Sequence, residues 1–201
     1  MKRLFIISAL LSVAAITWSQ DNEFTKKNSI GLNTSGLVNY TFKMEYEHYF
    51  KNRNSLQIAG GVILKQDASE NVSGMTCEIQ YRLNAVTPIY DGHAVFYFAP
   101  YGGYTAVDYS KETSGSYYDY SINKQVNITG QYKNMFNTIS AGCVAGVKLL
   151  FNDKMFLDFN LGGGLKYAQD FNAKDFAELG TLKLGYSGIY PRMNLSIGYA
   201  F

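Results

Sequence analysis

His48 and His93 are the only histidines of this 201-residue chain, so histidine-dependent catalysis or metal binding would have to use one of them. They lie far apart in the sequence, and so do the only two cysteines, Cys77 and Cys143. A structural or catalytic metal centre needs three or four such ligands in one place. We therefore predict no catalytic residues, no metal site and no cofactor, and we expect both cysteines to act as small apolar side chains without a disulfide.

Four acidic and four basic residues fall at alternate positions on the polar side of alternating segments: Lys43, Glu45, Glu47, Glu78, Arg82, Lys148, Asp158 and Arg192. Paired carboxylates could do general acid–base chemistry. Equal numbers of opposite charges on one face favour ion pairs instead. We predict that these eight residues form a structural charge network inside the protein.

The segments that must position these charges have a period of two. In residues 40–50, Phe42 and Met44 alternate with Lys43 and Glu45, and successive side chains of a strand point in opposite directions. No segment shows the 3.6-residue repeat of an amphipathic helix over three turns. The pattern predicts eight strands, at residues 29–35, 40–50, 56–65, 75–83, 94–104, 139–149, 155–167 and 192–201. The strand at 94–104 is apolar on both faces, so its inward side stays open.

Strand length and the charged face both favour a membrane barrel. A tilted strand needs roughly nine to eleven residues to cross a bilayer, whereas strands of soluble proteins cluster near five or six. Enclosed charges would be costly in a soluble lipocalin-like barrel and would spoil an apolar ligand cavity, but the lumen of a membrane barrel is polar. We predict an all-β fold, an eight-stranded antiparallel up-and-down transmembrane β-barrel.

The connections and the aromatic residues suit this fold. Short links around residues 51–54, 84–93 and 152–154 alternate with long ones at 105–133 and 168–188, as when turns face the periplasm and loops face the exterior. Aromatic residues near strand ends predict two interfacial girdles. The outer girdle would contain Tyr40, Tyr101, Tyr104 and Tyr167, and the periplasmic girdle Tyr49, Phe50, Tyr81, Phe151, Tyr199 and Phe201.

The beginning of the chain has the features of a secretory signal peptide. Two basic residues precede an uncharged apolar run at 4–16, and Thr17 and Ser19 fit the −3 and −1 positions of a cleavage site. We predict a signal peptide at residues 1–19 and one outer-membrane barrel domain at 20–201. Cleavage would remove two of the 18 basic residues and none of the 16 acidic ones, leaving a neutral chain. Without a basic run, we expect no nucleic-acid partner.

The segment at residues 108–133 is the most informative stretch that we predict to lie outside the strands. Five tyrosines stand there among serine, glycine, asparagine and charged residues, namely Tyr109, Tyr117, Tyr118, Tyr120 and Tyr132. Tyrosine offers a large amphipathic contact area at low entropic cost. We identify these residues as a candidate partner-binding loop, with a merely solvated loop as the open alternative.

Several segments also resemble a known group of proteins. Gln20 follows the predicted cut, residues 98–104 read Phe-Ala-Pro-Tyr-Gly-Gly-Tyr, residues 141–146 run into Val-Lys, and residues 191–201 end in an aromatic residue. Together they resemble the small outer-membrane β-barrel proteins of the Bacteroidota type, in the OmpA/OmpX-like barrel superfamily. The resemblance covers the predicted mature chain and brings no enzymatic motif.

The resemblance implies that Tyr199 and Phe201 form the terminal signal read by the barrel-assembly machinery, and that outer-membrane lipid surrounds the barrel. We expect an exported protein of the Gram-negative outer membrane, not an enzyme, with a structural or interaction role. It would present tyrosine-rich extracellular loops to a surface ligand or an envelope protein. Eight strands leave room only for side chains, so we expect no open pore. The alternatives are a narrow channel, a lipid-modifying outer-membrane enzyme, and a soluble lipocalin-like carrier.

Overall fold

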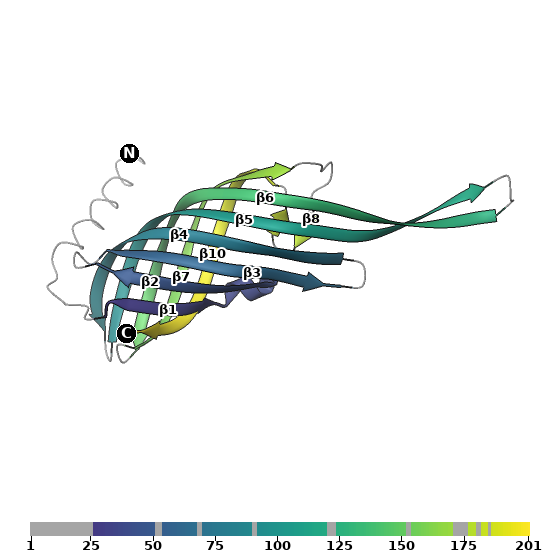
Figure 1. Cartoon of the computed structure of the whole chain (residues 1–201). Helices are drawn as coiled ribbons and strands as arrows, with labels where there is room; N and C mark the ends of the chain where they lie inside the picture. Colours follow the sequence, from purple (N-terminus) through teal and green to yellow (C-terminus); the bar gives the residue numbers. More distant parts are fainter. Residues whose placement is uncertain are drawn as a thin grey trace.

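The computed structural model describes residues 26–50, 54–67, 70–89, 92–119, 124–151, 154–170, 177–179, 182–184 and 186–201. Eight strands close into a barrel in the order β1-β10-β7-β6-β5-β4-β3-β2 (Figure 1). They are β1 (Asn28–Asn33), β2 (Thr41–Tyr49), β3 (Ser55–Gln66), β4 (Glu70–Ile89), β5 (Gly92–Asp119), β6 (Lys124–Phe151), β7 (Met155–Asp170) and β10 (Gly188–Ala200). Neighbouring barrel strands follow one another along the chain and are antiparallel, which confirms the predicted up-and-down barrel.

Three smaller elements accompany the barrel. A 3-10 helix, η1 (Ser35–Asn39), connects β1 to β2, and β8 (Ala177–Leu179) pairs with β9 (Leu182–Leu184) in a separate two-stranded sheet. In the described ranges, no helix is long and apolar enough to span a bilayer. The predicted signal peptide at residues 1–19 lies outside the described residues.

The barrel is apolar outside and polar inside, because side chains alternate along each strand. Along β2, Phe42 and Met44 are 49% and 48% exposed, whereas Lys43 and Glu45 are 8% and 6% exposed. The same outward direction is found on other strands for Ile30, Ile58, Ile79, Ile139, Leu165 and Leu195. Such a continuous apolar exterior around an ionic interior is the arrangement of a transmembrane barrel.

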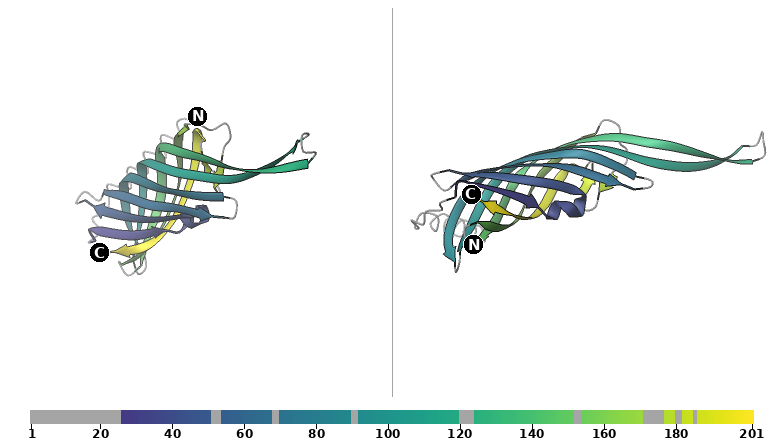
Figure 2. Two further views of the ribbon diagram at one scale, coloured as in Figure 1. Left: turned by 45° about the vertical axis from the view of Figure 1, so that its right-hand side comes forward. Right: turned by 60° about the horizontal axis from the view of Figure 1, so that its bottom comes forward.

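The two ends of the barrel differ. At one end, which we call the terminal end, only a few residues separate β2 from β3, β4 from β5 and β6 from β7. The start of the described residues meets Phe201 there, since the backbone N–H groups of Lys27 and Asn28 donate to the Phe201 carbonyl at 3.2 and 2.9 Å. At the opposite end, which we call the hairpin end, β5 and β6 extend well beyond the other strands (Figure 2).

This hairpin corrects the prediction that residues 108–133 lie outside the strands. β5 continues to Asp119 and β6 begins at Lys124, and the two strands stay paired throughout. β4 pairs with β5 only as far as Lys111, and β7 pairs with β6 only from Phe136. Beyond these residues β5 and β6 form a two-stranded ribbon, in which the backbone groups that face the partner strand are hydrogen-bonded. The serine- and glycine-rich composition is therefore compatible with paired strands here.

The strand with two apolar faces has a defined inward side. In residues 94–104, Tyr97 and Tyr101 point into the barrel and are 5% and 6% exposed. Placing Tyr49 and Tyr101 in the interfacial girdles is therefore wrong, because Tyr49 is also enclosed, at 8% exposure. Gly146, the partner of Tyr97 on the neighbouring strand β6, leaves room for the Tyr97 ring. A Cβ atom added at Gly146 would lie 2.5 Å from the Tyr97 Cζ atom.

Candidate functional site

Four charged side chains occupy the centre of the lumen, towards the terminal end. They come from β2 (Glu47), β4 (Arg82), β6 (Lys148) and β7 (Asp158). Arg82 Nη1 donates to Asp158 Oδ2 at 2.7 Å and to Glu47 Oε2 at 3.2 Å, and Lys148 Nζ forms an ion pair with Glu47. All four side chains are at most 2% exposed. Two cations thus neutralise two carboxylates, which compensates for the loss of hydration.

Aromatic rings fill the space around this central cluster. The Tyr97 hydroxyl donates to Asp158 Oδ1 at 2.6 Å, while the Tyr97 ring lies against Arg82, with 4.1 Å between the guanidinium carbon and the ring centroid. On the other side, Lys148 Nζ lies 4.2 Å from the centroid of the Phe156 ring. Cation–π contacts of this kind gain strength where water is excluded. Charged groups and rings together fill this part of the lumen.

A second ionic layer lies towards the hairpin end. Glu78 accepts from Lys43 Nζ at 2.8 Å through one carboxylate oxygen and from Arg192 Nη2 at 2.6 Å through the other. Gln80 connects the layers, because its Nε2 donates to Glu78 Oε1 at 2.6 Å and its Oε1 accepts from Arg82 Nε at 3.2 Å. The ionic groups of the lumen are therefore continuous along the barrel axis.

Glu45 joins this network through amide side chains. Its carboxylate accepts from Asn33 Nδ2 at 3.0 Å and from Gln57 Nε2 at 2.9 Å. Gln57 Oε1 in turn accepts from Arg82 Nη2 at 2.7 Å. The structure thus brings all eight predicted charged residues into one connected system. The sequence analysis did not single out the bridging glutamines, although Gln57 and Gln80 share the polar face with the charges.

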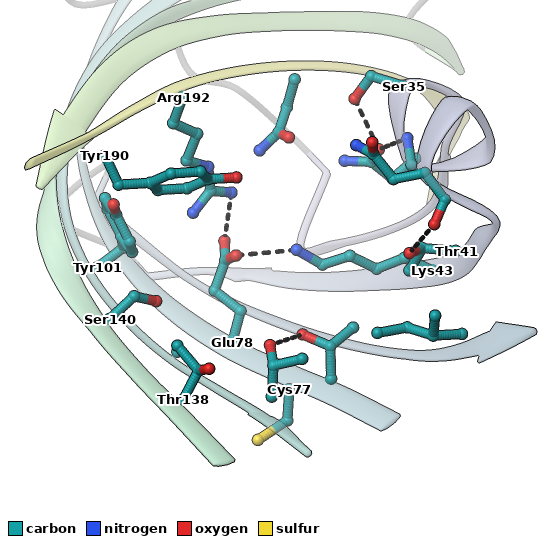
Figure 3. A pocket seen from close by; sticks show the side chains of 18 of the residues that line it. Ser35, Thr41, Lys43, Cys77, Glu78, Tyr101, Thr138, Ser140, Tyr190 and Arg192 are labelled. Carbon is teal, nitrogen blue, oxygen red and sulfur yellow. Dashed lines mark hydrogen bonds and ion pairs between the residues drawn. The ribbon is translucent and has the colours of Figure 1, made fainter. Parts of the chain in front are cut away.

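Beyond the Glu78 layer, the lumen contains a cavity of about 160 Å³, which we call the vestibule (Figure 3). Two aromatic rings, Tyr101 and Tyr190, form part of its wall, and Figure 3 shows Arg192 beside them. Hydroxyl groups also line it, from Ser35, Thr41, Thr76, Thr105, Thr138 and Ser140. Tyr190 and Lys166 are lining residues that sequence reasoning missed. The position of Tyr190, two residues before Arg192 on the same strand, was the available signal.

The described part of the tyrosine-rich segment forms an aromatic cluster at the base of the hairpin. The Tyr109 ring lies edge-on to Tyr132 and Phe136, with centroid separations of 6.4 and 6.3 Å. The Tyr109 hydroxyl donates to Glu70 Oε1 at 3.2 Å, and Lys65 Nζ donates to Glu70 Oε2 at 2.7 Å. The hydrogen bond from Lys65 lowers the pKa of the Glu70 carboxyl below its usual value. This cluster joins β3, β4, β5 and β6.

The other tyrosines of this segment are not part of that cluster. Tyr117 and Tyr118 lie in the backbone of β5, but their side chains are outside the described parts of the structure. Tyr120 lies outside the described residues altogether. The ribbon therefore carries at least two of the five candidate tyrosines into the region beyond the barrel wall.

The residues considered for catalysis or metal binding remain separate. His48 Nδ1 lies 2.9 Å from Asn28 Oδ1 at the terminal end, and the side chain of His93 is outside the described residues. Cys77 and Cys143 are both free and exposed. Across the described ranges, histidine, cysteine and acidic residues form no group of three that could hold a metal ion.

The proposed assembly signal lies at the barrel seam. Tyr199 points outward from β10, where it is 46% exposed, and Phe201 is 53% exposed. β10 closes the barrel by pairing with β1. The terminal aromatic residues are therefore on the exterior, at the strand that completes the fold.

Among known proteins, this chain is similar to several solved structures. No family model and no curated protein matches this chain. It is similar to the N-terminal β-barrel domain of Pseudomonas aeruginosa OprF, with 12% identity, a TM-score of 0.34, and coverage of 88% of this chain and 96% of that chain. It is also similar to Ail, the attachment invasion locus protein of Yersinia pestis, with 12% identity, a TM-score of 0.36, and coverage of 88% and 99%.

The complex of Ail with the heparin analogue sucrose octasulfate gives 11% identity, a TM-score of 0.35, and coverage of 88% and 99%. These similarities carry no functional assignment to this chain. The barrel topology and the side-chain directions described above come from the chain itself.

Proposed function

We propose that this protein is an outer-membrane β-barrel with a structural or interaction role, which exposes its β5–β6 hairpin on the outside of the cell. The observation that carries this proposal is the sorting of side chains around the barrel. Outward residues such as Phe42 and Ile79 are about half exposed, whereas Arg82 and Asp158 are enclosed. An apolar surface of this extent is unfavourable in water but favourable in the hydrocarbon core of a bilayer.

The proposed orientation places the terminal end in the periplasm and the hairpin end outside the cell. Short turns on one side and longer extensions on the other are typical of outer-membrane barrels. The lumen gives no open path in this proposal, because Arg82, Lys148 and the surrounding rings fill its centre. The same charges make the interior a poor site for an apolar ligand, which argues against a lipocalin-like carrier.

The proposed contact surface is the protruding hairpin, with Tyr132, which is 38% exposed, at its base. Tyr109 is only 7% exposed, so it supports the Tyr132 ring from within and does not itself meet a partner. Paired strands hold Tyr132 in a defined position, so little conformational entropy would be lost on binding a surface ligand or an envelope protein. The membrane lipid and the barrel-assembly machinery are further proposed partners, the latter through Tyr199 and Phe201.

The first test is fractionation of cells that express the full chain. We expect the protein in the outer-membrane fraction, with gel migration that changes on heating, as for a folded barrel. Release from the envelope without detergent would refute the location.

Crosslinking from position 132 should then capture a ligand or protein, and crosslinking from outward position 79 is the matched control. Stable conductance in planar bilayers would contradict the closed lumen, and altered lipid A on mass spectra would contradict a non-enzymatic role.

A further inference from the structure

The wall of the barrel is incomplete on one side of β10, towards the hairpin end. β10 pairs with β7 along nearly its whole length, but with β1 only from Ser196 onwards. Among the described residues, the last backbone hydrogen bond across this seam runs from the Thr34 N–H to the Leu195 carbonyl, at 2.8 Å. Residues 188–194 therefore have one edge that no described strand covers, and η1 lies beside them instead (Figure 2).

This edge of β10 is not suited to pairing with a further strand. Backbone groups of alternate residues point to the same side of a strand, so Pro191 and Ile189 face the seam as Leu195 does. Pro191 has no N–H to donate, and the Ile189 carbonyl accepts from the Tyr186 hydroxyl at 3.3 Å. The Leu195 N–H donates to Ser35 Oγ at 3.3 Å. The edge thus lacks the regular row of donors and acceptors that an added strand needs.

A groove of about 770 Å³ lies between η1 and β10, and we call it the seam groove. Its size is within the usual range of ligand pockets, roughly 300–1,000 Å³. Three apolar side chains that face the barrel exterior line it, namely Leu161, Ile189 and Met193, each at least 50% exposed. Tyr190 and Arg192 line both the seam groove and the vestibule, where Figure 3 shows their side chains. The groove therefore runs along the open edge of β10, between the barrel exterior and the vestibule.

The apolar part of the seam groove is continuous with the outward face of the barrel, and Val38 of η1, which is also exposed, adds to it. A hydrocarbon chain gains free energy by burying its methylene groups in such a groove, and it needs no hydrogen bonds from the interrupted edge of β10. We propose that the seam groove binds one acyl chain of a membrane lipid, with the lipid headgroup towards the hairpin end. This inference rests on the proposed outer-membrane location of the barrel.

The test is photocrosslinking in the membranes of cells that express the full chain. Benzoylphenylalanine is placed at position 190, on the lumen side of the open edge, and lipid adducts are detected by mass spectrometry of the purified protein. We expect a lipid adduct there. The matched control is position 101, also a tyrosine of the vestibule, which lies on a strand paired on both edges and should give no adduct. Position 189, which faces outward, reports contact with the bilayer itself.

The three positions separate this proposal from the proposed function. A lipid adduct at position 189 without one at position 190 overturns the seam groove and leaves the outer-membrane role standing. No adduct at position 189 overturns the location and this inference together. Equal adducts at positions 190 and 101 would show lipid filling the vestibule by another route, and a protein adduct at position 190 would show a polypeptide in the groove. Either result overturns the proposal.

Two variants of η1 test the groove by filling it. Val38→Trp places a large ring in the seam groove and should reduce the yield of the lipid adduct at position 190 severalfold, because the ring occupies the space of the chain. Leu37→Trp is the matched control, since Leu37 is exposed on the same helix and lines neither the seam groove nor the vestibule. It should leave the yield unchanged. Heat-dependent gel migration checks that both variants fold, and equal yields in the two folded variants would overturn the proposal.

Discussion

Replacing Arg82 by leucine tests whether the lumen charges stabilise the barrel. Arg82 is 1% exposed and is the only group in the described structure that forms ion pairs with both Asp158 and Glu47. Without Arg82, Glu47 still forms its ion pair with Lys148. Asp158 then keeps only the hydrogen bond from the Tyr97 hydroxyl among its interactions with described residues. Breaking a buried ion pair on one side typically costs about 3–5 kcal/mol. We expect Arg82→Leu to lower the free energy of unfolding by that amount.

The assay is equilibrium unfolding in urea of the barrel folded in lipid vesicles, followed by heat-dependent gel migration. The control is Lys111→Met, because the ion pair of Lys111 with Glu70 is long, at 3.7 Å, and the lysine is 49% exposed. Pairs of this kind contribute about 0–1 kcal/mol. The double variant Arg82→Leu/Asp158→Leu should recover part of the loss, since no uncompensated carboxylate then remains at position 158. If Arg82→Leu stays within about 1 kcal/mol of the parent protein, the reasoning about a structural network is wrong.

Three other changes test separate parts of the structure. Gly146→Ala should destabilise the barrel by about 1–3 kcal/mol in the same unfolding assay, because its Cβ would overlap the neighbouring lumen tyrosine. Gly60→Ala, whose Cβ meets nothing within 4 Å, should have little effect, and equal losses would contradict this explanation. Ile79→Arg should cost about 2–4 kcal/mol in vesicles if position 79 faces the bilayer centre, and a neutral result would place it elsewhere. Finally, an NMR titration should find the pKa of Glu70 below its usual value, and the contact between Glu70 and Lys65 should be lost as the pH falls through that pKa. Lys65→Met should return the pKa of Glu70 towards normal. An unchanged pKa in this variant would exclude Lys65 as the cause.

Alternation along the sequence was sufficient to predict which charged side chains are enclosed. A strand has only two faces, so the positions of Lys43 and Glu45 fix the direction of Phe42 and Met44. The same rule places Tyr49 inside, because Tyr49 stands an even number of residues from Lys43 and Glu45 on the same strand. Its position near a strand end favoured the interfacial girdle instead. Parity along the strand decides the direction of a side chain, whereas its residue type only favours one environment.

The extent of β5 and β6 could not be read from composition. Serine, glycine and asparagine between residues 108 and 133 are common in loops, and the apolar alternation weakens there. In the structure, Glu112 and Gln131 are cross-strand partners, beyond the last residue of β5 that pairs with β4. Pairing between two long strands satisfies the backbone groups that face each other, whatever the side chains are. Such long-range pairing is a property of two segments together, so inspection of either segment alone does not find it.

The lumen network also bears on how this sequence selects one register. Arg82 and Asp158 are 76 residues apart in the chain, and Glu47 and Lys148 are 101 apart, yet each pair meets in the same layer. A slip of one residue in any strand would turn its charges to the exterior and its apolar residues to the lumen. Neither change could be compensated locally, because the partners lie on other strands. The apolar exterior can accept many alternative packings, whereas the ionic interior is complete in only one. We therefore infer that the charges contribute more to the uniqueness of the fold than a core of apolar residues would.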